Sequence, residues 1–421
     1  MTDISIPFIR PKSVLHYWLQ LAQEPNHDFI RLLDFLSERD LGLLDIALSE
    51  RLIRKLYTQP LTKYYSSHEI AISSFKHCRS HLNWIVNRDL HGHIQKLQIS
   101  YSRNIPEELV DFKTRHFRFP RLLEIRCWQI SKKFCCALSW YSPNLRYFKI
   151  IGGTYELSDD SIDALCAGCI HLKYIEITED SSQGGFCRLT GASVSSIFEH
   201  CKELEVLVLG NWGNLDLSTL DCSALSTLRV LDIDYPRNTS PDRLHDIFAS
   251  NSRLETVKLT SDLDGPNLPH DAVMTALGAH CHLLKHVTLY TCYWDKITDA
   301  GIVAMIQGCP SLETIDIASW NAPDPDDEEE DEPFVPTLSV TNAAMYAIAQ
   351  YCPNLVSFKI NSSIHEPLAY DDTGLGAIVQ GCPHLRVIYR NHKVYYAAPG
   401  VDTAVNSYYT YYREFHQWKY A

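Results

Sequence analysis

The chain has 421 residues, of which 45% are hydrophobic and 21% are charged, so it can bury a large core. Its formal net charge of −13 argues against a nucleic-acid-binding groove, which needs a basic face. No apolar run approaches the roughly 18 residues that span a membrane, and the first residues lack the pattern of a secretory signal. We therefore expect a soluble protein of the cytoplasm, the nucleus or both.

Residues 11–90 are predicted to be helical. Apolar residues recur at helical spacing over 13–23 and again over 28–61. A further helix is expected over 84–90, and it leads into an extended segment at 94–99. The first part of the chain is therefore expected to form a small helical module.

From about residue 90 onward the chain repeats one phrase: Cys, two residues, Leu, two residues, apolar, one residue, apolar. The phrase Leu, or its equivalent, recurs at intervals of 23 to 32 residues, except for one interval of 43. These intervals are close to the period of leucine-rich repeats, and a stacked repeat favours binding over catalysis. The positions are Ile94, Leu122, Leu145, Leu172, Leu204, Leu228, Leu254, Leu284, Leu312, Leu355 and Leu385.

Each unit is predicted to contain one helix and one short strand. The alternation of apolar residues over 312–317 has the period of a strand. Ile302, Met305 and Ile306 lie seven, four and three positions before Cys309, which is the stripe of an amphipathic helix. The predicted fold is an α/β leucine-rich-repeat solenoid, a right-handed horseshoe of about 11 repeats with its strands on the concave face and its helices on the convex face.

The starts of several helices are also marked in the sequence. Ser, Thr or Asp side chains can cap the first turn, and the carboxylates that follow them favour the helix N-terminus. The predicted caps are Ser158, Ser240, Thr298 and Asp371.

The fourteen cysteines are predicted to be core thiols rather than disulfides or metal ligands. Six of them occupy the same position of the repeat, where a small apolar residue can end the helix. Cys166 and Cys169 match only half of a zinc knuckle, and the matching second pair is missing. No metal or cofactor is predicted.

The repeat over residues 90–392 resembles the cysteine-containing leucine-rich repeats of F-box proteins. Residues 35–57, FLSERDLGLLDIALSERLIRKLY, resemble an F-box core, although the usual Leu-Pro opening is missing. The resemblance implies a substrate-recognition subunit of a Skp1–cullin–F-box ubiquitin ligase, which binds a Skp1-type adaptor and a cullin through its N-terminal helices. A helical cap on the first repeat is the alternative for these helices. The adaptor-binding residues that the resemblance implies are Leu32, Leu33, Leu36, Leu41, Leu44 and Ile46.

Three regions are predicted: 1–90 as the F-box-like or capping region, 91–392 as the solenoid and 393–421 as an aromatic C-terminal cap. The 43-residue interval contains the acidic run 324–332, so we expect a solvated insertion over 322–336. A tolerated insertion and a docking segment for a basic partner are both open interpretations.

An unknown protein target is expected on the concave face and on the loops that follow the strands. The second and fourth residues after each phrase Leu should face outward, and large aromatic residues gather in the loops just beyond. The alternative is that these aromatic side chains cover the solenoid's own core. The candidate partner-binding residues are Tyr147, Tyr174, Trp212, Tyr235, Tyr290, Trp294 and Trp320.

Catalysis is not predicted, since the chain has no phosphate-binding glycine motif and no nucleophile elbow. Two other functions remain open at this point. One is a stand-alone leucine-rich-repeat interaction scaffold without a ligase role. The other is a leucine-rich-repeat GTPase-activating protein, which would need a projecting arginine such as Arg188 or Arg237.

Overall fold

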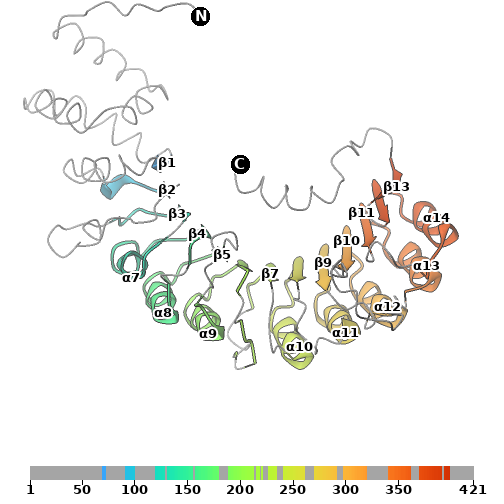
Figure 1. Cartoon of the computed structure of the whole chain (residues 1–421), viewed down its shortest axis with the longest axis horizontal. Helices are drawn as coiled ribbons and strands as arrows, with labels where there is room; N and C mark the ends of the chain where they lie inside the picture. The colour runs from blue at the N-terminus through green and yellow to red at the C-terminus, as the bar shows by residue number, and fades with distance from the viewer. Residues whose placement is uncertain are drawn as a thin grey trace, which may run out of the picture.

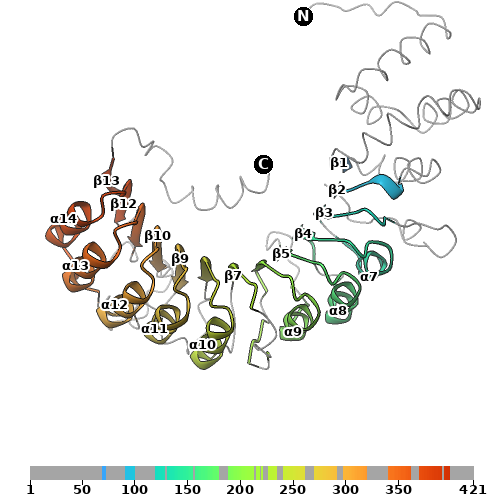
Figure 2. The same ribbon diagram turned by 180° about the vertical axis from the view of Figure 1, so that it is seen from behind.

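The strands and helices of the protein form a curved solenoid in a computed structural model. The structure describes residues 69–72, 91–99, 119–128, 130–154, 157–179, 188–212, 215–218, 220, 226–234, 240–260, 270–291, 297–319, 340–361, 369–390 and 393–398. The strands of these residues form one 13-stranded sheet in chain order. The sheet lines the inner side of an arc and the helices lie on its outer side (Figures 1 and 2). The predicted α/β leucine-rich-repeat solenoid is confirmed.

Strands β1 to β12 are parallel, and β13 pairs with β12 in the antiparallel sense. Each of the 11 predicted repeat starts lies just before one of the strands β2 to β12. The strands are β1 (Glu69–Ile72), β2 (Lys96–Ile99), β3 (Glu124–Cys127), β4 (Tyr147–Gly152), β5 (Tyr174–Glu179), β6 (Val206–Gly210), β7 (Val230–Asp234), β8 (Thr256–Thr260), β9 (His286–Thr291), β10 (Thr314–Ser319), β11 (Ser357–Asn361), β12 (Val387–Arg390) and β13 (Lys393–Ala397).

The helices cover the convex side of the sheet, and each contacts the next along most of the arc (Figure 1). They are the single 3-10 turn η1 (His91–His93) and the α-helices α7 (Lys132–Tyr141), α8 (Asp159–Gly168), α9 (Gly191–His200), α10 (Pro241–Ser250), α11 (His270–His280), α12 (Asp299–Gly308), α13 (Asn342–Tyr351) and α14 (Asp372–Gly381). The predicted caps Ser158, Ser240, Thr298 and Asp371 each precede a helix.

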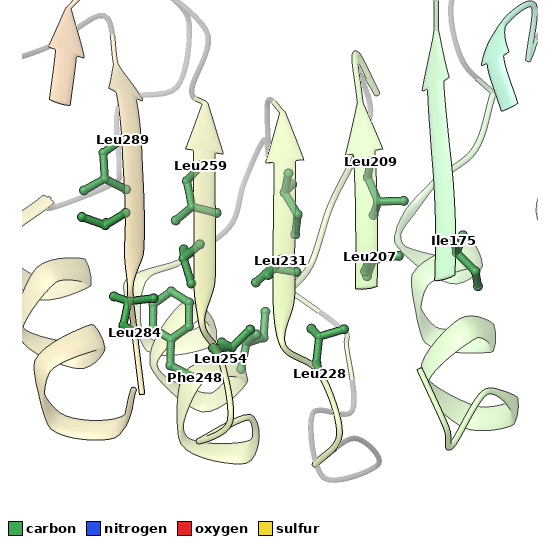
Figure 3. Close-up of a cluster of buried hydrophobic side chains, with 14 of the residues drawn as sticks. Ile175, Leu207, Leu209, Leu228, Leu231, Phe248, Leu254, Leu259, Leu284 and Leu289 are labelled. Atoms are coloured by element: carbon green, nitrogen blue, oxygen red, sulfur yellow. The ribbon is translucent and has the colours of Figure 1, made fainter. Parts of the chain in front are cut away.

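The core between the sheet and the helices is built in the same way along the arc. The phrase Leu is buried, as at Leu228 and Leu254 (Figure 3). The second and fourth residues of β6, Leu207 and Leu209, are also buried. Because neighbouring strands pair residue for residue, these side chains stack along the sheet. Burying one such side chain contributes about 1.5–3 kcal/mol.

The phrase cysteine is buried and directly follows the helix, as predicted, but it also donates a hydrogen bond to the previous repeat. The thiol of Cys309 lies 3.3 Å from the carbonyl oxygen of Cys281. The thiol of Cys169 lies 3.4 Å from the carbonyl oxygen of Ser142. Burial raises the pKa of Cys309 to about 12, so the proton stays on sulfur and can be donated. The cysteine thiol therefore links the C-terminal ends of helices in consecutive repeats through a hydrogen bond.

Aspartates at the helix N-termini also link consecutive repeats. Asp299 at the start of α12 accepts hydrogen bonds from the backbone N–H of Thr341 at 2.7 Å and from its hydroxyl at 2.6 Å. Thr341 is the N-cap of α13. Asp159 accepts the same pair of hydrogen bonds from Thr190, the N-cap of α9. Each of these carboxylates therefore orients the N-cap of the next helix, in addition to its effect at the N-terminus of its own helix.

The helix layer is interrupted near the middle of the solenoid. The described residues between β6 and β7 contain no helix, although α9 and α10 lie on either side (Figure 1). Asn211 has a φ of 59°, a left-handed conformation that Asn tolerates, and the next side chain, Trp212, is fully buried. The indole N–H of Trp212 donates to the carbonyl oxygen of Ile177 at 3.0 Å. Leu215, Leu217 and Leu220, which follow Trp212, are also buried in this described part of the chain.

The sheet continues past both predicted ends of the solenoid, residues 91 and 392. Strand β1 lies within the predicted N-terminal region, and β13 lies within the predicted C-terminal tail. By pairing with β12, β13 covers the last edge of the sheet. The candidate adaptor-binding residues within 32–46, the acidic insertion 322–336 and residues 399–421 lie outside the described residues.

Candidate functional site on the concave face

Side chains that point away from the core form two rows across the concave face. The strand register aligns one residue from each strand in each row. The first row is Glu124, Tyr147, Tyr174, Val206, Val230, Thr256, His286, Thr314 and Ser357. The second row is Arg126, Lys149, Glu176, Val208, Asp232, Lys258, Thr288, Asp316 and Lys359.

Aromatic side chains dominate the part of the first row on β4 and β5. The rings of Tyr147 and Tyr174 stack with their centroids 3.9 Å apart and their planes at 14°. The guanidinium of Arg126 lies 5.4 Å from the centroid of the Tyr147 ring, within the range of a cation–π interaction. These side chains form a preorganised surface, because each is held by its neighbour.

An ion pair lies beside the stacked rings. Lys149 Nζ is 2.8 Å from Glu176 Oε2, and their side chains are only 12% and 14% exposed. Burial and the adjacent Glu176 carboxylate raise the pKa of Tyr174. Its hydroxyl therefore stays protonated and donates to Glu176. The carboxylate of Glu176 is thus oriented by one cation and one hydroxyl.

The middle of the concave face combines valines with carboxylates. Val206 and Val208 on β6 and Val230 on β7 are partly exposed, so apolar surface faces the hollow of the arc. Asp232 and Asp234 share one cation: Lys258 Nζ lies 3.1 Å from Asp232 and 3.7 Å from Asp234. One ammonium group therefore serves two carboxylates at this point.

Burial raises the pKa of Asp232 to about 6, although Lys258 acts in the opposite direction. The neighbouring carboxylates Asp234 and Glu176 also raise the pKa of Asp232. Burial and the two neighbouring carboxylates each disfavour the negatively charged form of Asp232. The middle of the concave face is therefore short of positive charge.

The part of the face on β8 to β11 is polar and balanced in charge. Asp316 accepts a hydrogen bond from the Tyr290 hydroxyl at 2.7 Å and lies 3.2 Å from Lys359 Nζ. His286 Nδ1 is 3.2 Å from the Thr314 hydroxyl. Hydroxyl side chains take the positions that tyrosines and valines take in the first row on β4 to β7.

Charges at the start of the strands pair with one another. Lys173 lies 2.8 Å from Glu205, and Glu255 lies 2.7 Å from Arg229 and 3.2 Å from Lys285. Such surface pairs contribute about 0–1 kcal/mol each. They favour the correct stacking of repeats and leave little unbalanced charge on that edge.

The structure places the candidate partner-binding residues in different environments. Tyr147 and Tyr174 come together on the concave face, and their partner-binding role remains a prediction. The prediction that Trp212 is exposed at the rim is wrong: its side chain is fully buried, and its indole N–H donates to the carbonyl oxygen of Ile177. Tyr290 is only 4% exposed, so it does not project from the rim as predicted; it orients Asp316. Tyr235, Trp294 and Trp320 lie outside the described residues.

The sequence analysis missed Arg126 and Val208 as members of the second row. Arg126 belongs to a repeat whose phrase is weak, and its side chain contacts Glu124 at 2.6 Å. Val208 looks like an ordinary strand residue because its environment depends on both neighbouring strands. The rule that the fourth residue after each phrase Leu faces outward also applies to Val208, because it lies four residues after the phrase residue Leu204.

Other kinds of site find little support in the part of the chain that the structure covers. Those residues contain no group of three or more His, Cys, Asp or Glu side chains placed to hold a metal ion. None of the described helices is both long and apolar enough to cross a bilayer. Arg188 is exposed just before α9, and Arg237 lies outside the described residues.

No family model matches the sequence. The chain is 22% identical over 312 residues to F-box/LRR-repeat protein 4 of Bos taurus, an alignment covering 68% of this chain and 46% of that protein. The chain resembles F-box/leucine-rich-repeat proteins. It is also 26% identical over 210 residues to GRR1-like protein 1 of Arabidopsis thaliana, covering 46% of this chain and 31% of that protein. The alignments thus span less than half the length of these curated relatives.

Two solved structures have similar folds at low identity. A chain of the yeast Rad7 and Elc1 complex has a TM-score of 0.45 and 14% identity, with 93% of this chain and 94% of that chain covered. The leucine-rich repeat-containing protein LegL7 of Legionella pneumophila has a TM-score of 0.34 and 11% identity, with 72% of this chain and 86% of that chain covered.

Proposed function

We propose that the protein is the substrate-recognition subunit of a Skp1–cullin–F-box type ubiquitin ligase. The resemblance to F-box/leucine-rich-repeat proteins supports this function at the level of the family. The N-terminal helices would bind a Skp1-type adaptor, and the concave face would bind the protein to be ubiquitinated. The chain itself would contribute positioning and no bond-breaking chemistry.

The observation that carries the recognition role is the contrast between a uniform core and a varied concave face. The same Leu and Cys positions are buried from repeat to repeat, as at Leu172 and Leu312. The outward positions instead carry stacked tyrosines, valines and poorly hydrated ion pairs. Aromatic and charged groups held in place before binding suit a protein interface.

Binding of a purified Skp1-type adaptor to the full-length protein tests the ligase role. We expect Leu36→Asp or Leu41→Asp to abolish the interaction, since a carboxylate would replace an apolar contact. Asp232→Asn is the matched control, because Asp232 lies on the concave face and should leave adaptor binding unchanged. Thermal unfolding of each variant checks that the solenoid is intact.

An interaction scaffold is the second candidate. Within the described residues the parallel sheet begins at β1, whose outer edge needs a cover, and the helices predicted before it could serve as that cover alone. A folded wild-type protein that does not bind the adaptor would favour the scaffold. Stimulation of GTP hydrolysis in a bound GTPase that is lost in Arg188→Ala would instead favour a GTPase-activating role.

A further inference from the structure

The second row of the concave face alternates in charge but contains one neutral position between two carboxylates. Lys149 pairs in register with Glu176, Glu176 with Val208, Val208 with Asp232, and Asp232 with Lys258. The row therefore runs positive, negative, neutral, negative, positive. A positive charge above Val208 would complete the alternation.

The cations of the row do not balance the carboxylates around Val208. Lys258 is shared between Asp232 and Asp234, and Lys149 is engaged by Glu176 on the far side of β5. The negative charge of Glu176 also raises the pKa of Asp232. Valine supplies no charge or hydrogen bond between them. Together with Asp234, three carboxylates share two lysines here, so this part of the face carries an excess of negative charge that favours a cation.

The other neutral position of the row has a different environment. Thr288 lies between Lys258 on β8 and Asp316 on β10, so its two neighbours have opposite charges. In the second row as defined above, Val208 alone has a carboxylate on each neighbouring strand. The feature thus belongs to one place on the face and is not a property of the repeat.

We propose that an arginine of the bound protein lies over Val208, with its guanidinium between Glu176 and Asp232. The inference rests on the proposed use of the concave face for binding a protein, and it specifies the chemistry of the bound segment. Strands are about 4.8 Å apart, so the backbones of Glu176 and Asp232 lie about 10 Å apart. Each carboxylate pairs with a lysine on the strand away from β6, Lys149 on β4 and Lys258 on β8, so the guanidinium enters between two existing ion pairs.

Arginine fits this position better than lysine for two reasons. Its aliphatic stem can pack on the partly exposed Val206, Val208 and Val230. Its planar guanidinium has donors directed to more than one side, whereas a lysine ammonium is a compact point charge. The bound segment is therefore an arginine-bearing stretch of protein.

Fluorescence anisotropy with the full-length protein can test the proposal at pH 7. One probe is a fluorescein-labelled hexapeptide pool with arginine fixed at its third position and neutral residues elsewhere. The second pool carries citrulline, which has nearly the same shape without the charge. We expect the arginine pool to bind about tenfold more tightly, in line with a charged hydrogen bond.

Two variants address the site itself. Asp232→Asn should reduce binding of the arginine pool to the level of the citrulline pool. Val208→Lys should do the same by supplying the missing cation from within the protein. Asp316→Asn is the matched control, since Asp316 is in the same row and also pairs with a lysine, but it lies three strands away from Asp232. It should leave the difference between the pools intact.

The proposal is wrong if the two pools bind equally, if neither pool binds, or if Asp316→Asn acts as strongly as Asp232→Asn. If Asp232→Asn does not fold, Val208→Lys alone decides, because it adds a cation beside carboxylates and should remain folded. Adaptor binding depends on the N-terminal helices, so its absence would contradict the ligase role without affecting the peptide result.

Discussion

The concave face differs between the strands β4 to β7 and the strands β8 to β11, although the core beneath them is alike. The first set presents tyrosines and valines, as at Tyr174 and Val206. The second presents hydroxyl groups and a balanced ion pair, as at Thr314 and Lys359. Leucines at the same repeat position, such as Leu204 and Leu312, are fully buried in both sets.

The fold constrains the residues at the buried positions of each repeat and leaves the outward positions of the strands free to vary. Buried positions must fill a constant space between strand and helix, so they carry similar residues in every repeat. Outward positions on the strands meet no such requirement. The difference between the two sets is therefore best explained by what each part of the face contacts, and changes at the two kinds of position should have separable effects.

Trp212→Ala should have the largest effect on the common core. Removing a fully buried indole, which also donates to Ile177, should lower the free energy of unfolding by about 3–5 kcal/mol. Urea denaturation followed by circular dichroism measures the loss. A loss below about 1 kcal/mol would mean that the loop repacks, and the original placement of Trp212 at an interface would then regain support.

Gly308→Ala tests the close packing of helices under β8 to β11. A Cβ on Gly308 would overlap the carbonyl oxygen of Gly278 in the preceding helix, so the variant should lose about 1–3 kcal/mol of unfolding free energy.

Gly376→Ala is the control for this change. A Cβ there meets no atom within 4 Å, so this helical position should gain up to about 1 kcal/mol. Thermal unfolding of both variants checks the sign. If Gly308→Ala and Gly376→Ala change the unfolding free energy equally, helix propensity controls both positions, and the close approach of Gly308 to Gly278 does not.

Asp299→Ala should lower the unfolding free energy by about 1–2 kcal/mol, because the cap of α13 loses two hydrogen bonds from Thr341. Asp160→Ala is the matched change in another first turn. Its side chain is 86% exposed and only pairs with Lys132, so a change within about 0.5 kcal/mol is expected. A comparable loss from both variants in urea denaturation would contradict the proposed link between repeats.

The smallest expected effect is a pH dependence of arginine binding on the part of the face that contains Asp232. Asp232 has its pKa raised to about 6 by burial, and it faces Asp234, Glu176 and Lys258. Its carboxylate form binds arginine, so affinity for the arginine pool should fall as pH decreases through about 6, by at most tenfold per pH unit for one proton.

Anisotropy titrations at about pH 7, 6 and 5, which are this pKa and about one unit on either side of it, measure the slope. Asp316→Asn should keep the slope, and Asp232→Asn should remove it. A slope that persists in Asp232→Asn would assign the titration to another group.

Much of the solenoid could be predicted because its signals are local. The spacing of the phrase and the stripe that ends at Cys309 identify strands and helices without knowledge of distant residues. The outward direction of Lys149 and Asp232 follows from alternation along a strand in the same way. The prediction was less successful for Trp212, because an aromatic residue after a strand can point outward or inward with the same local sequence.

The sequence by itself determined the repeat, the fold class and the two sides of the strands in most of the repeats, because these depend on spacings within about one repeat. Only the tertiary structure decided that Trp212 is buried against Ile177, that Asp299 accepts from the N-cap of α13, and that Val208 lies between Glu176 and Asp232. These facts depend on the register between strands and on the stacking of units. Residues 24 to 42 positions apart along the chain become neighbours there, and no local pattern records which of them meet.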